Sequence, residues 1–220
     1  MMLASAAYHV MGLPPMPPVT PVVFIVDDDI SVRESLEVLI RQAGWQPEPC
    51  ASAQEFLAHS HGLAPSCLVL DVSLPDLNGL ELQSRIGANY IDMPIIFITG
   101  HGDVPMTVQA MKAGAVDFLT KPFDDDALLA AIETALARSE ASIEQEVQKQ
   151  SLRDRYGTLS PREQEVMALV VTGLMNKQVA GRLGITEVTV KAHRGQVMRK
   201  MRAKSVPDLV KMAASLDSGR

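Results

Sequence analysis

The stretch CLVLDVSLPDLNGLEL, residues 67–82, runs from an apolar segment into a turn and carries one carboxylate between them. Leu68, Val69 and Leu70 predict a buried strand, inside which a carboxylate would be costly to desolvate without a partner. Because the turn begins soon after Asp71, we expect this residue at the mouth of the strand. A helix cap or a turn aspartate is the simpler interpretation of one such residue, so other parts of the sequence must decide its role.

Three further apolar runs resemble this strand, over residues 22–26, 94–100 and 116–120. Segments with helical periodicity lie between and after them, and two of these open with predicted capping boxes, at Ser31–Glu34 and Ser52–Glu55. Strands that are apolar throughout and alternate with helices indicate a parallel sheet covered by helices on both faces. The fold class predicted for this part of the chain is therefore α/β.

The carboxyl ends of parallel strands meet at one edge of a sheet, and ligands bind there. The residues at the predicted strand ends are Asp27, Asp28, Asp71, Thr99 and Lys121. Three carboxylates, a hydroxyl and a lysine are therefore expected to converge, although they lie far apart in the sequence. One strand-end aspartate is unremarkable, but four strand ends with complementary chemistry indicate a functional site.

The chemistry of the predicted site follows from its residue types. Clustered carboxylates repel one another and need a cation, and hard oxygen ligands suit Mg²⁺. A Mg²⁺ beside Asp71 would neutralise an incoming phosphoryl group, which Lys121 could pair with and Thr99 could hydrogen-bond. Asp71 is then the predicted nucleophile, which forms an aspartyl-phosphate. The alternative is an acid–lysine cluster that holds ion pairs and performs no chemistry.

These motifs resemble a known family. Residues 22 to about 139 resemble the receiver domain of response regulators, and the whole chain resembles regulators of the NarL/FixJ type. The motifs that carry the resemblance are VDDD, LDVSLPDLNGLEL, FITGHGD and AGAVDFLTKPF, in the family's order. The resemblance implies a flavodoxin-like, doubly wound sheet of five parallel strands.

The resemblance also implies a role for each strand-end residue. Asp71 matches the phosphoacceptor, Asp28 the direct Mg²⁺ ligand, and Asp27 the acid that acts mainly through water. The other roles are a Mg²⁺-binding backbone carbonyl at Ser73, a switch hydroxyl at Thr99, a switch aromatic at Phe118, and a phosphate-pairing lysine at Lys121, joined to Pro122 by a cis bond. Ser73 and His101 occupy the positions that tune dephosphorylation in the family.

The charge of the chain is distributed unevenly. Residues 1–156 carry 9 Lys and Arg against 21 Asp and Glu, a net charge of −12, whereas residues 157–220 carry 11 against 5, a net charge of +6. An acidic body joined to a basic end indicates two domains with different partners. The basic end is the candidate for binding nucleic acid.

The basic end has the pattern of a helix-turn-helix. Ser160, Pro161 and Glu163 predict a capped first helix, and Gly184 marks a tight turn between a short helix and a basic helix capped by Thr186. A fourth helix follows, so we predict an all-α domain of four helices. In a helix-turn-helix the second helix enters the major groove. The residues of the basic helix predicted to face the core are Val188, Val190, Val197 and Met201.

This segment resembles a LuxR-type effector domain over its full length. The predicted DNA-binding residues are Lys177, Thr186, Thr189, Lys191, His193, Arg194, Arg199 and Lys200. Lys191 and Arg194 fall at groove-facing positions of the family's recognition helix, whereas Ala192 and Gly195 replace bulkier contacts. Taken alone, a basic amphipathic helix is more simply a solvated surface, and the preceding helix, the glycine turn and the charge distribution favour DNA.

The sequence divides into four predicted parts. Residues 1–20 form a proline-rich disordered tail, residues 21–138 the receiver domain, residues 139–156 a helical linker, and residues 157–220 the helix-turn-helix domain. The stretch from residue 124 to about 156 lacks proline and glycine and predicts one long helix. Its sparse apolar stripe allows either a weak coiled coil or a solvated helix.

Composition limits the class of protein. A hydrophobic content of 47% and a charged content of 21% are typical of a soluble globular protein. Two cysteines predict neither a disulfide framework nor a metal cluster. This cysteine content is consistent with a protein of the reducing cytoplasm. No apolar run reaches the roughly 18 residues of a membrane span. The N-terminus lacks the basic region of a signal peptide, so we expect a cytoplasmic protein without a membrane partner.

The combined prediction is a transcriptional regulator switched by phosphorylation, with at most weak autophosphatase activity. A sensor histidine kinase would phosphorylate Asp71, and the phosphorylated homodimer would bind paired half-sites in double-stranded DNA. One alternative is a Mg²⁺-dependent phosphatase or phosphotransferase, which is disfavoured because Ser73 stands where a second acid–base aspartate would be expected. The other is a phosphorylation-independent DNA-binding protein, which the complete set of strand-end residues disfavours.

Overall fold

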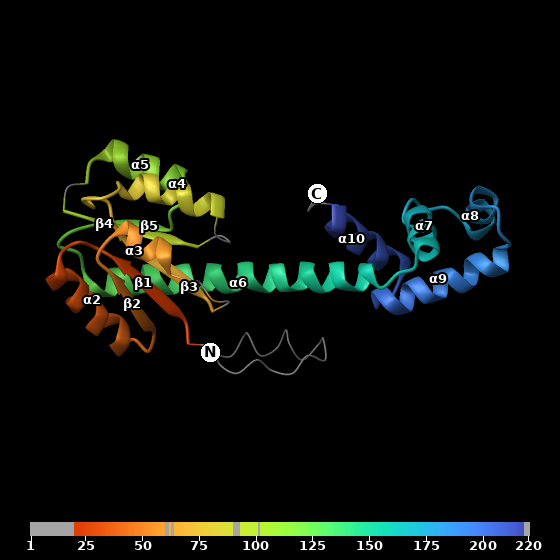
Figure 1. The fold of residues 1–220 in the computed structure, drawn as a ribbon, viewed down its shortest axis with the longest axis horizontal. Coiled ribbons are helices and arrows are strands. Elements are labelled where there is room, and N and C mark those ends of the chain that lie inside the picture. Colours follow the sequence, from red (N-terminus) through yellow and green to blue (C-terminus); the bar gives the residue numbers. More distant parts are fainter. Residues whose placement is uncertain (1–19, 60–61, 63, 90–92, 101, 218–220) are drawn as a thin grey trace. The chain divides into compact units, whose positions relative to one another are not determined.

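The structure is a computed structural model that describes residues 20–59, 62, 64–89, 93–100 and 102–217 (Figure 1). The predicted disordered tail, apart from Thr20, and the predicted tuning residue His101 lie outside the described residues. The chain divides into two compact units, the first ending at Ile143 and the second beginning at Glu144.

The first unit is a doubly wound α/β fold, as predicted. Its five-stranded parallel sheet has the strand order β2-β1-β3-β4-β5. The strands are β1 (Val22–Val26), β2 (Gln46–Cys50), β3 (Ser66–Asp71), β4 (Ile95–Thr99) and β5 (Asp117–Thr120). The helices are α2 (Ile30–Gln42), α3 (Ala53–Ala58), α4 (Gly79–Asn89), α5 (Val104–Lys112) and the first part of α6 (Asp125–Gly157).

Both faces of the sheet are apolar, which explains the continuous apolar runs in the sequence. On one face Phe24, Leu70 and Phe97 pack against α3, α4 and α5. On the other face Ile25 and Ile98 belong to a second cluster, which α2 and α6 cover (Figure 1). The central strand β3 is therefore buried on both sides. It ends at the edge of the sheet where the carboxyl ends of the strands lie.

The edge strand β2 is the one strand that the residue patterns did not predict. Its sequence, QPEPC, contains two prolines, which cannot donate hydrogen bonds to a neighbouring strand. The N–H of Gln46 and the carbonyl of Cys50 bond to residues that flank β1, so alternate residues of β2 direct their backbone groups toward that strand. Pro47 and Pro49 lie between these positions. Their missing N–H groups therefore face the open side of the sheet edge, where no strand partner is needed.

Two of the predicted helix starts need correction. Helix α2 begins at Ile30 because the carboxylate of Asp29 accepts a hydrogen bond from the N–H of Ser31, at 2.8 Å. The predicted capping box at Ser31–Glu34 is therefore wrong, and an aspartate two residues earlier is the cap. At α3 the Ser52 cap is confirmed, but the Glu55 carboxylate accepts from the N–H of Ala51 instead of closing the box on Ser52.

Helix α6 is continuous from Asp125 to Gly157. This agrees with the single long helix predicted from residue 124 to about 156, a stretch without proline or glycine. Its N-terminal part packs on the sheet of the first unit through Leu128, Ile132 and Leu136. Near its C-terminal end, Leu152 and Tyr156 pack against the core of the second unit. Among the helices that the structure describes, none has both the length and the apolar character of a membrane span.

The second unit is helical, as predicted, and contains α7 (Pro161–Val170), α8 (Asn176–Leu183), α9 (Glu187–Met201) and α10 (Val206–Asp217). The capping box between Ser160 and Glu163 and the Thr186 cap are both confirmed. Gly184 ends α8 with φ of 65°, a left-handed conformation that glycine adopts without strain. Beyond this turn, α9 shares one hydrophobic core with α7 and α8.

One core prediction for α9 is wrong. The side chains of Val190, Val197 and Met201 are buried as expected. Val188, however, is 79% exposed. Two residues correspond to about 200° of rotation around a helix, so Val188 lies on the side opposite Val190. Apolar character alone assigned it to the core, and helical geometry places it at the surface.

Candidate functional site

The register of the sheet brings the predicted site residues together. Val26 of β1 aligns with Leu70 of β3, so the residues that follow them, Asp27 and Asp71, lie side by side. Asp71 in turn aligns with Ile98 of β4, one residue before Thr99. Strand pairing therefore collects residues at one edge that are distant in the sequence, as the parallel arrangement predicted.

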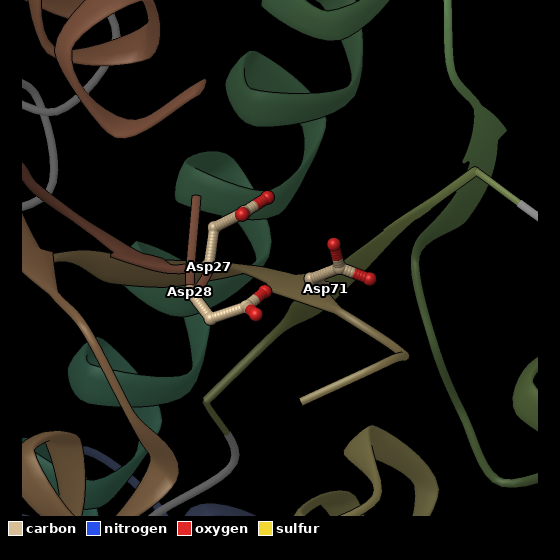
Figure 2. Close-up of side chains that lie close together, drawn as sticks. All are labelled: Asp27, Asp28 and Asp71. Atoms are coloured by element: carbon tan, nitrogen blue, oxygen red, sulfur yellow. The ribbon is translucent and has the colours of Figure 1, made fainter. Parts of the chain in front are cut away.

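Three carboxylates form an acidic cluster at this edge. One ligand oxygen from each of Asp27, Asp28 and Asp71 lies within 4.8 Å of the other two. Figure 2 shows the three side chains at the ends of β1 and β3. Asp27 and Asp71 are buried and Asp28 is exposed, so the cluster opens to solvent on one side. An oxygen-only donor set of this kind is suited to a hard divalent cation.

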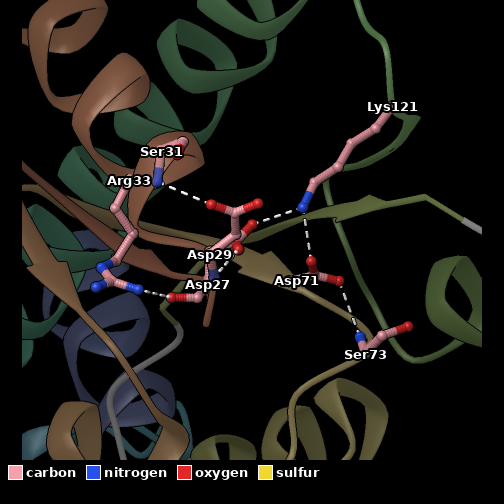
Figure 3. Close-up of polar contacts among 7 residues, drawn as sticks. All are labelled: Asp27, Asp29, Ser31, Arg33, Asp71, Ser73 and Lys121. Carbon is pink, nitrogen blue, oxygen red and sulfur yellow. Dashed lines mark hydrogen bonds and ion pairs between the residues drawn. The ribbon is translucent and has the colours of Figure 1, made fainter.

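Lys121 joins two of these carboxylates. Its Nζ lies 2.6 Å from Oδ2 of Asp27 and 2.6 Å from Oδ2 of Asp71 (Figure 3). Its backbone N–H donates to the carbonyl of Thr99 at 2.7 Å, which fixes the start of the loop after β5. The bond to Pro122 is cis, as the resemblance implied.

The electrostatics of the cluster explain why it can attract a cation. Burial lowers the pKa of Lys121, but its hydrogen bonds to Asp27 and Asp71 raise it by more, so the lysine stays charged. Burial raises the pKa of Asp27, against the opposing effect of the Lys121 ammonium. With all four groups ionised, three carboxylates and one ammonium leave a formal charge of −2. A divalent cation would balance this charge.

Backbone groups hold the carboxylates in place. The N–H of Ser73 donates to Oδ1 of Asp71 at 2.9 Å, and the N–H of Asp29 donates to Oδ1 of Asp27 at 2.9 Å (Figure 3). Arg33 donates from Nη1 to the carbonyl of Asp27 at 2.6 Å. The structure thus places Ser73 beside Asp71, although the contact it shows is made by the N–H and not by the carbonyl that was predicted to bind Mg²⁺.

Gly79 has a role at the site beyond the turn that the sequence indicated. A Cβ at this position would lie 2.9 Å from the carbonyl oxygen of Asp71 and 3.0 Å from Cα of Val72. The N–H of Gly79 also donates to the carbonyl of Val72 at 3.1 Å. The N-terminus of α4 therefore rests directly on the backbone that carries Asp71. A side chain would push the two apart.

The two predicted switch residues lie on neighbouring strands. Thr99 is fully buried at the end of β4, and Phe118 of β5 is partly buried with its ring centroid 6.2 Å from that of Phe97. A Cβ on Gly102 would approach Phe118 and Thr120 to 3.0 Å and Thr99 to 3.3 Å. The loop after β4 therefore lies close against both predicted switch residues.

Asp76 is a further site residue that sequence reasoning treated only as part of the turn. Its carboxylate accepts hydrogen bonds from the backbone N–H groups of Gln54, at 3.1 Å, and Ala53, at 3.4 Å. The loop that follows Asp71 is thereby tied to the N-terminus of α3. An aspartate in a turn signals a cap, but its partner lies more than 20 positions away and only the folded chain reveals it.

In the second unit, the predicted DNA-binding residues fall into three groups. Lys177, Lys191 and Arg199 are exposed, and His193 is partly buried. Thr186 and Thr189 share a hydrogen bond between their hydroxyls at 2.9 Å, and the Thr186 hydroxyl also caps α9. These two threonines therefore support the start of the helix.

Arg194 and Lys200 contact other parts of the same unit. Arg194 donates from Nη1 to Oδ1 of Asn176, the first residue of α8, at 2.9 Å. Lys200 lies 2.6 Å from Oε2 of Glu163 and donates to the carbonyl of Thr158 at 3.0 Å. The hydrogen bond from Lys200 lowers the pKa of Glu163. Both cations therefore hold α9 against its neighbours.

Comparisons with known proteins cover both units. Residues 23–133 match the model of the response regulator receiver domain, and residues 157–213 match that of the bacterial regulatory proteins of the luxR family. Nodulation protein W of Bradyrhizobium diazoefficiens is 53% identical over 89% of this chain and 86% of its own length. Response regulator protein TmoT of Ectopseudomonas mendocina is 46% identical over 89% of each chain. The solved structure of the response regulator StyR has 47% identity and a TM-score of 0.79, over 89% of this chain and 99% of that chain.

Proposed function

The chain belongs to the response regulators that join a receiver domain to a LuxR-type DNA-binding domain, and from this membership we propose how its switch works. It is a transcriptional regulator controlled by phosphorylation. In the proposed reaction, a carboxylate oxygen of Asp71 attacks the phosphorus of a phosphohistidine on a sensor kinase. The new P–O bond forms as the P–N bond breaks, and the imidazole leaves with the electron pair.

The acidic cluster supports the proposed role of Mg²⁺. Asp27, Asp28 and Asp71 would hold the ion, together with the backbone carbonyl of Ser73, and it would supply positive charge to the phosphoryl oxygens. The chain's own groups do the rest. The N–H of Ser73 orients the Asp71 carboxylate, and Lys121 exchanges its carboxylate partner for an oxygen of the transferred group.

We further propose that the phosphoryl group is sensed by Thr99 and Phe118. A phosphoryl group on Asp71 adds negative charge and strong acceptors next to β4. The Thr99 hydroxyl would donate to it, and the space vacated would allow the Phe118 ring to turn inward. Gly102 supports this idea, because the loop it occupies lies against both side chains and must move with them.

The surface that would respond is on α5. Val104, Val108 and Met111 recur at helical spacing on this helix and are 77%, 44% and 43% exposed. The helix follows directly after the loop that contains Gly102. We propose that this apolar face pairs with its copy in a phosphorylated homodimer, which buries side chains that are otherwise unfavourably hydrated.

A separate surface is available for the kinase. Ile30 and Val38 of α2 are 60% and 54% exposed. Leu39 of the same helix lines a depression together with Phe123 and Lys121, among other residues. Because Lys121 also belongs to the acidic cluster, this depression adjoins the phosphoacceptor. We propose that the phosphohistidine-bearing helices of the kinase dock here.

The second unit carries the output. Helix α9 is proposed to enter the major groove of double-stranded DNA, with one copy on each half-site. The sequence from residue 188 to residue 207 contains six lysines and arginines and neither aspartate nor glutamate. A surface of this charge attracts the phosphate backbone.

We do not propose rapid hydrolysis of the aspartyl-phosphate at Asp71, because Ser73 offers no carboxylate to activate water.

The observation that carries the proposal is the ion-paired cluster of Asp27, Asp28, Asp71 and Lys121. Intact-mass measurement after incubation with Mg²⁺ and acetyl phosphate tests it. We expect the chain to gain one phosphoryl group, Asp71→Asn to gain none, and Glu81→Gln, at an exposed position of α4, to behave as the wild type. Phosphorylation of Asp71→Asn would contradict the assignment. Continuous release of free phosphate would favour the phosphatase alternative.

A further inference from the structure

The outward side of α9 presents an unusually exposed valine. Val190, Val197 and Met201 mark the side of the helix that is buried in the core of the second unit. Val188 projects from the opposite side, and its 79% exposure is the highest among the large hydrophobic side chains of the described residues. It is the second residue of α9, in the first turn of the helix.

Neither helix formation nor packing accounts for this side chain. A β-branched residue is a poorer helix former than lysine, glutamate or alanine. Within the part of the chain that the structure describes, Val188 belongs to none of the hydrophobic clusters. Single exposed apolar residues are common on protein surfaces. This one, however, lies in the segment of a helix-turn-helix that meets base edges.

The charges around Val188 favour DNA over an apolar protein partner. Lys191 lies one turn further along the helix and is exposed, and Lys177 is exposed on α8. The exposed Glu187 beside Val188 is the one carboxylate of α9, against four lysines and arginines. The side chain of Ala192 is exposed one turn beyond Val188 and is small, so it does not shield the valine. Residues 157–220 together carry a net charge of +6. A polyanion therefore fits this surface.

The hydrogen-bonding side chains in the first half of α9 are largely engaged within the protein. Thr189 bonds to Thr186, and Arg194 bonds to Asn176. Lys191 remains available for base edges or phosphates. Among the groups that a base pair displays in the major groove, the 5-methyl group of thymine is the apolar one. An exposed aliphatic side chain at this place matches it.

We propose that Val188 recognises thymine by contacting its 5-methyl group in the major groove, at one position in each half-site. The proposal rests on the proposed function, in which α9 enters that groove. It adds a specificity-determining residue whose contact with the base is apolar. Such a contact depends on the thymine methyl group and not on the hydrogen-bonding pattern of the base pair.

The test uses deoxyuridine, which pairs as thymidine does but lacks the methyl group. Duplexes that the full chain selects from a random DNA pool, in the presence of Mg²⁺ and acetyl phosphate, are resynthesised with each dT replaced by dU in turn. Dissociation constants are measured by fluorescence anisotropy at one salt concentration. At one position per half-site we expect the wild type to lose about fourfold in affinity, the effect of removing one buried methyl group.

Val188→Ala should weaken binding to the thymine duplex by a similar factor. Replacing dT by dU at that one position should no longer change the affinity of this variant, whereas the effects at other positions should remain. Val210→Ala, at an exposed position of α10, is the matched control and should retain the full uracil effect. The proposal is overturned if Val188→Ala binds the thymine duplex like the wild type, or if its uracil effect persists at every position. A change in oligomeric state of Val188→Ala without a change in the uracil effect would also overturn it and assign the valine to a protein contact.

The wild-type selection separates this proposal from the proposed function. A chain that enriches no sequence from the pool contradicts the proposed DNA-binding output, and the thymine contact with it. A chain that enriches a sequence, and whose Val188→Ala variant keeps the uracil effect, contradicts only the thymine contact. Circular dichroism of the variants verifies that these surface substitutions leave the fold unchanged.

Discussion

The Nζ atom of Lys121 lies 2.6 Å from Oδ2 of Asp71, although the two residues are 50 positions apart in the sequence. The same ammonium lies 2.6 Å from the carboxylate of Asp27. A phosphoryl group on Asp71 would offer this lysine new anionic oxygens. The ion pair is therefore the contact that phosphorylation is expected to rearrange first.

Lys121→Ala should accept a phosphoryl group but fail to form the phosphorylated dimer. The nucleophile and the acidic cluster remain in this variant, whereas the cation that would pair with the phosphoryl oxygens is lost. Intact mass measures acceptance, and light scattering measures dimerisation. Lys204→Ala, exposed in the second unit and not part of the proposed dimer surface on α5, is the lysine control. A normal phosphate-driven dimer in Lys121→Ala would show that the lysine does not transmit the signal.

Two exposed valines should separate the proposed kinase and dimer surfaces. Val108→Asp should weaken the phosphorylated dimer by more than about tenfold, because it would bury an unpaired charge, and should leave transfer from the kinase unchanged. Val38→Asp should slow transfer from the kinase and leave phosphorylation by acetyl phosphate and dimerisation intact. Each variant is the control for the other. Equal defects in both assays for both variants would contradict the assignment of two surfaces.

Gly79→Ala should destabilise the first unit by about 1–3 kcal/mol and slow phosphorylation of Asp71. The new Cβ would lie 2.9 Å from the Asp71 carbonyl oxygen, so the strand end and α4 would have to separate. Gly62→Ala, in the same unit, where the nearest atom to the added Cβ would be the Ala64 nitrogen at 4.0 Å, should be neutral or slightly stabilising. Urea unfolding followed by Trp45 fluorescence and phosphorylation rates measure the two effects. Equal stability of the two variants would show that the backbone contact does not constrain the site.

Glu163 should make the stability of the second unit depend on pH. Its hydrogen bond to Lys200 lowers its pKa in the folded state below the ordinary value of 4.5, so ionisation stabilises the folded form at pH values above 4.5. This contribution should disappear as the pH falls from 4.5 through the folded-state pKa. Circular dichroism during urea unfolding of residues 144–220 measures it. Glu163→Gln should be less stable at pH 7 and show a flatter pH dependence, and an unchanged slope would contradict the ion pair's role.

Lys191 and Arg199 should affect DNA binding in different ways. Lys191 is exposed early in α9, whereas Arg199 lies three turns along and donates a hydrogen bond to Gln196. Lys191→Ala should reduce binding to the selected sequence by about 1–3 kcal/mol with little effect on scrambled DNA. Arg199→Ala should weaken both and reduce the salt slope by about one. Binding to both DNAs across a salt series measures this, and equal losses would mean that neither residue reads sequence.

Much of the receiver fold could be predicted because its signals are local. The apolar runs of β1 and β4 end in Asp27 and Thr99, and parallel strands must collect such ends at one edge. The edge strand β2 could not be predicted in this way, because prolines normally argue against strands. Only its place at the sheet edge makes Pro47 and Pro49 acceptable.

Residue type and order alone predicted Asp71 as the phosphoacceptor, and they determined the acidic cluster, the charge asymmetry and the helix-turn-helix pattern. The tertiary structure decided which partners these residues have. It placed Lys121 between two carboxylates, brought Gly79 against the backbone of Asp71, joined Lys200 to Glu163, and turned Val188 away from the core. The physical reason is that composition and periodicity describe one segment at a time, whereas ion pairs, close backbone contacts and burial depend on distances between segments that exist only in the folded chain.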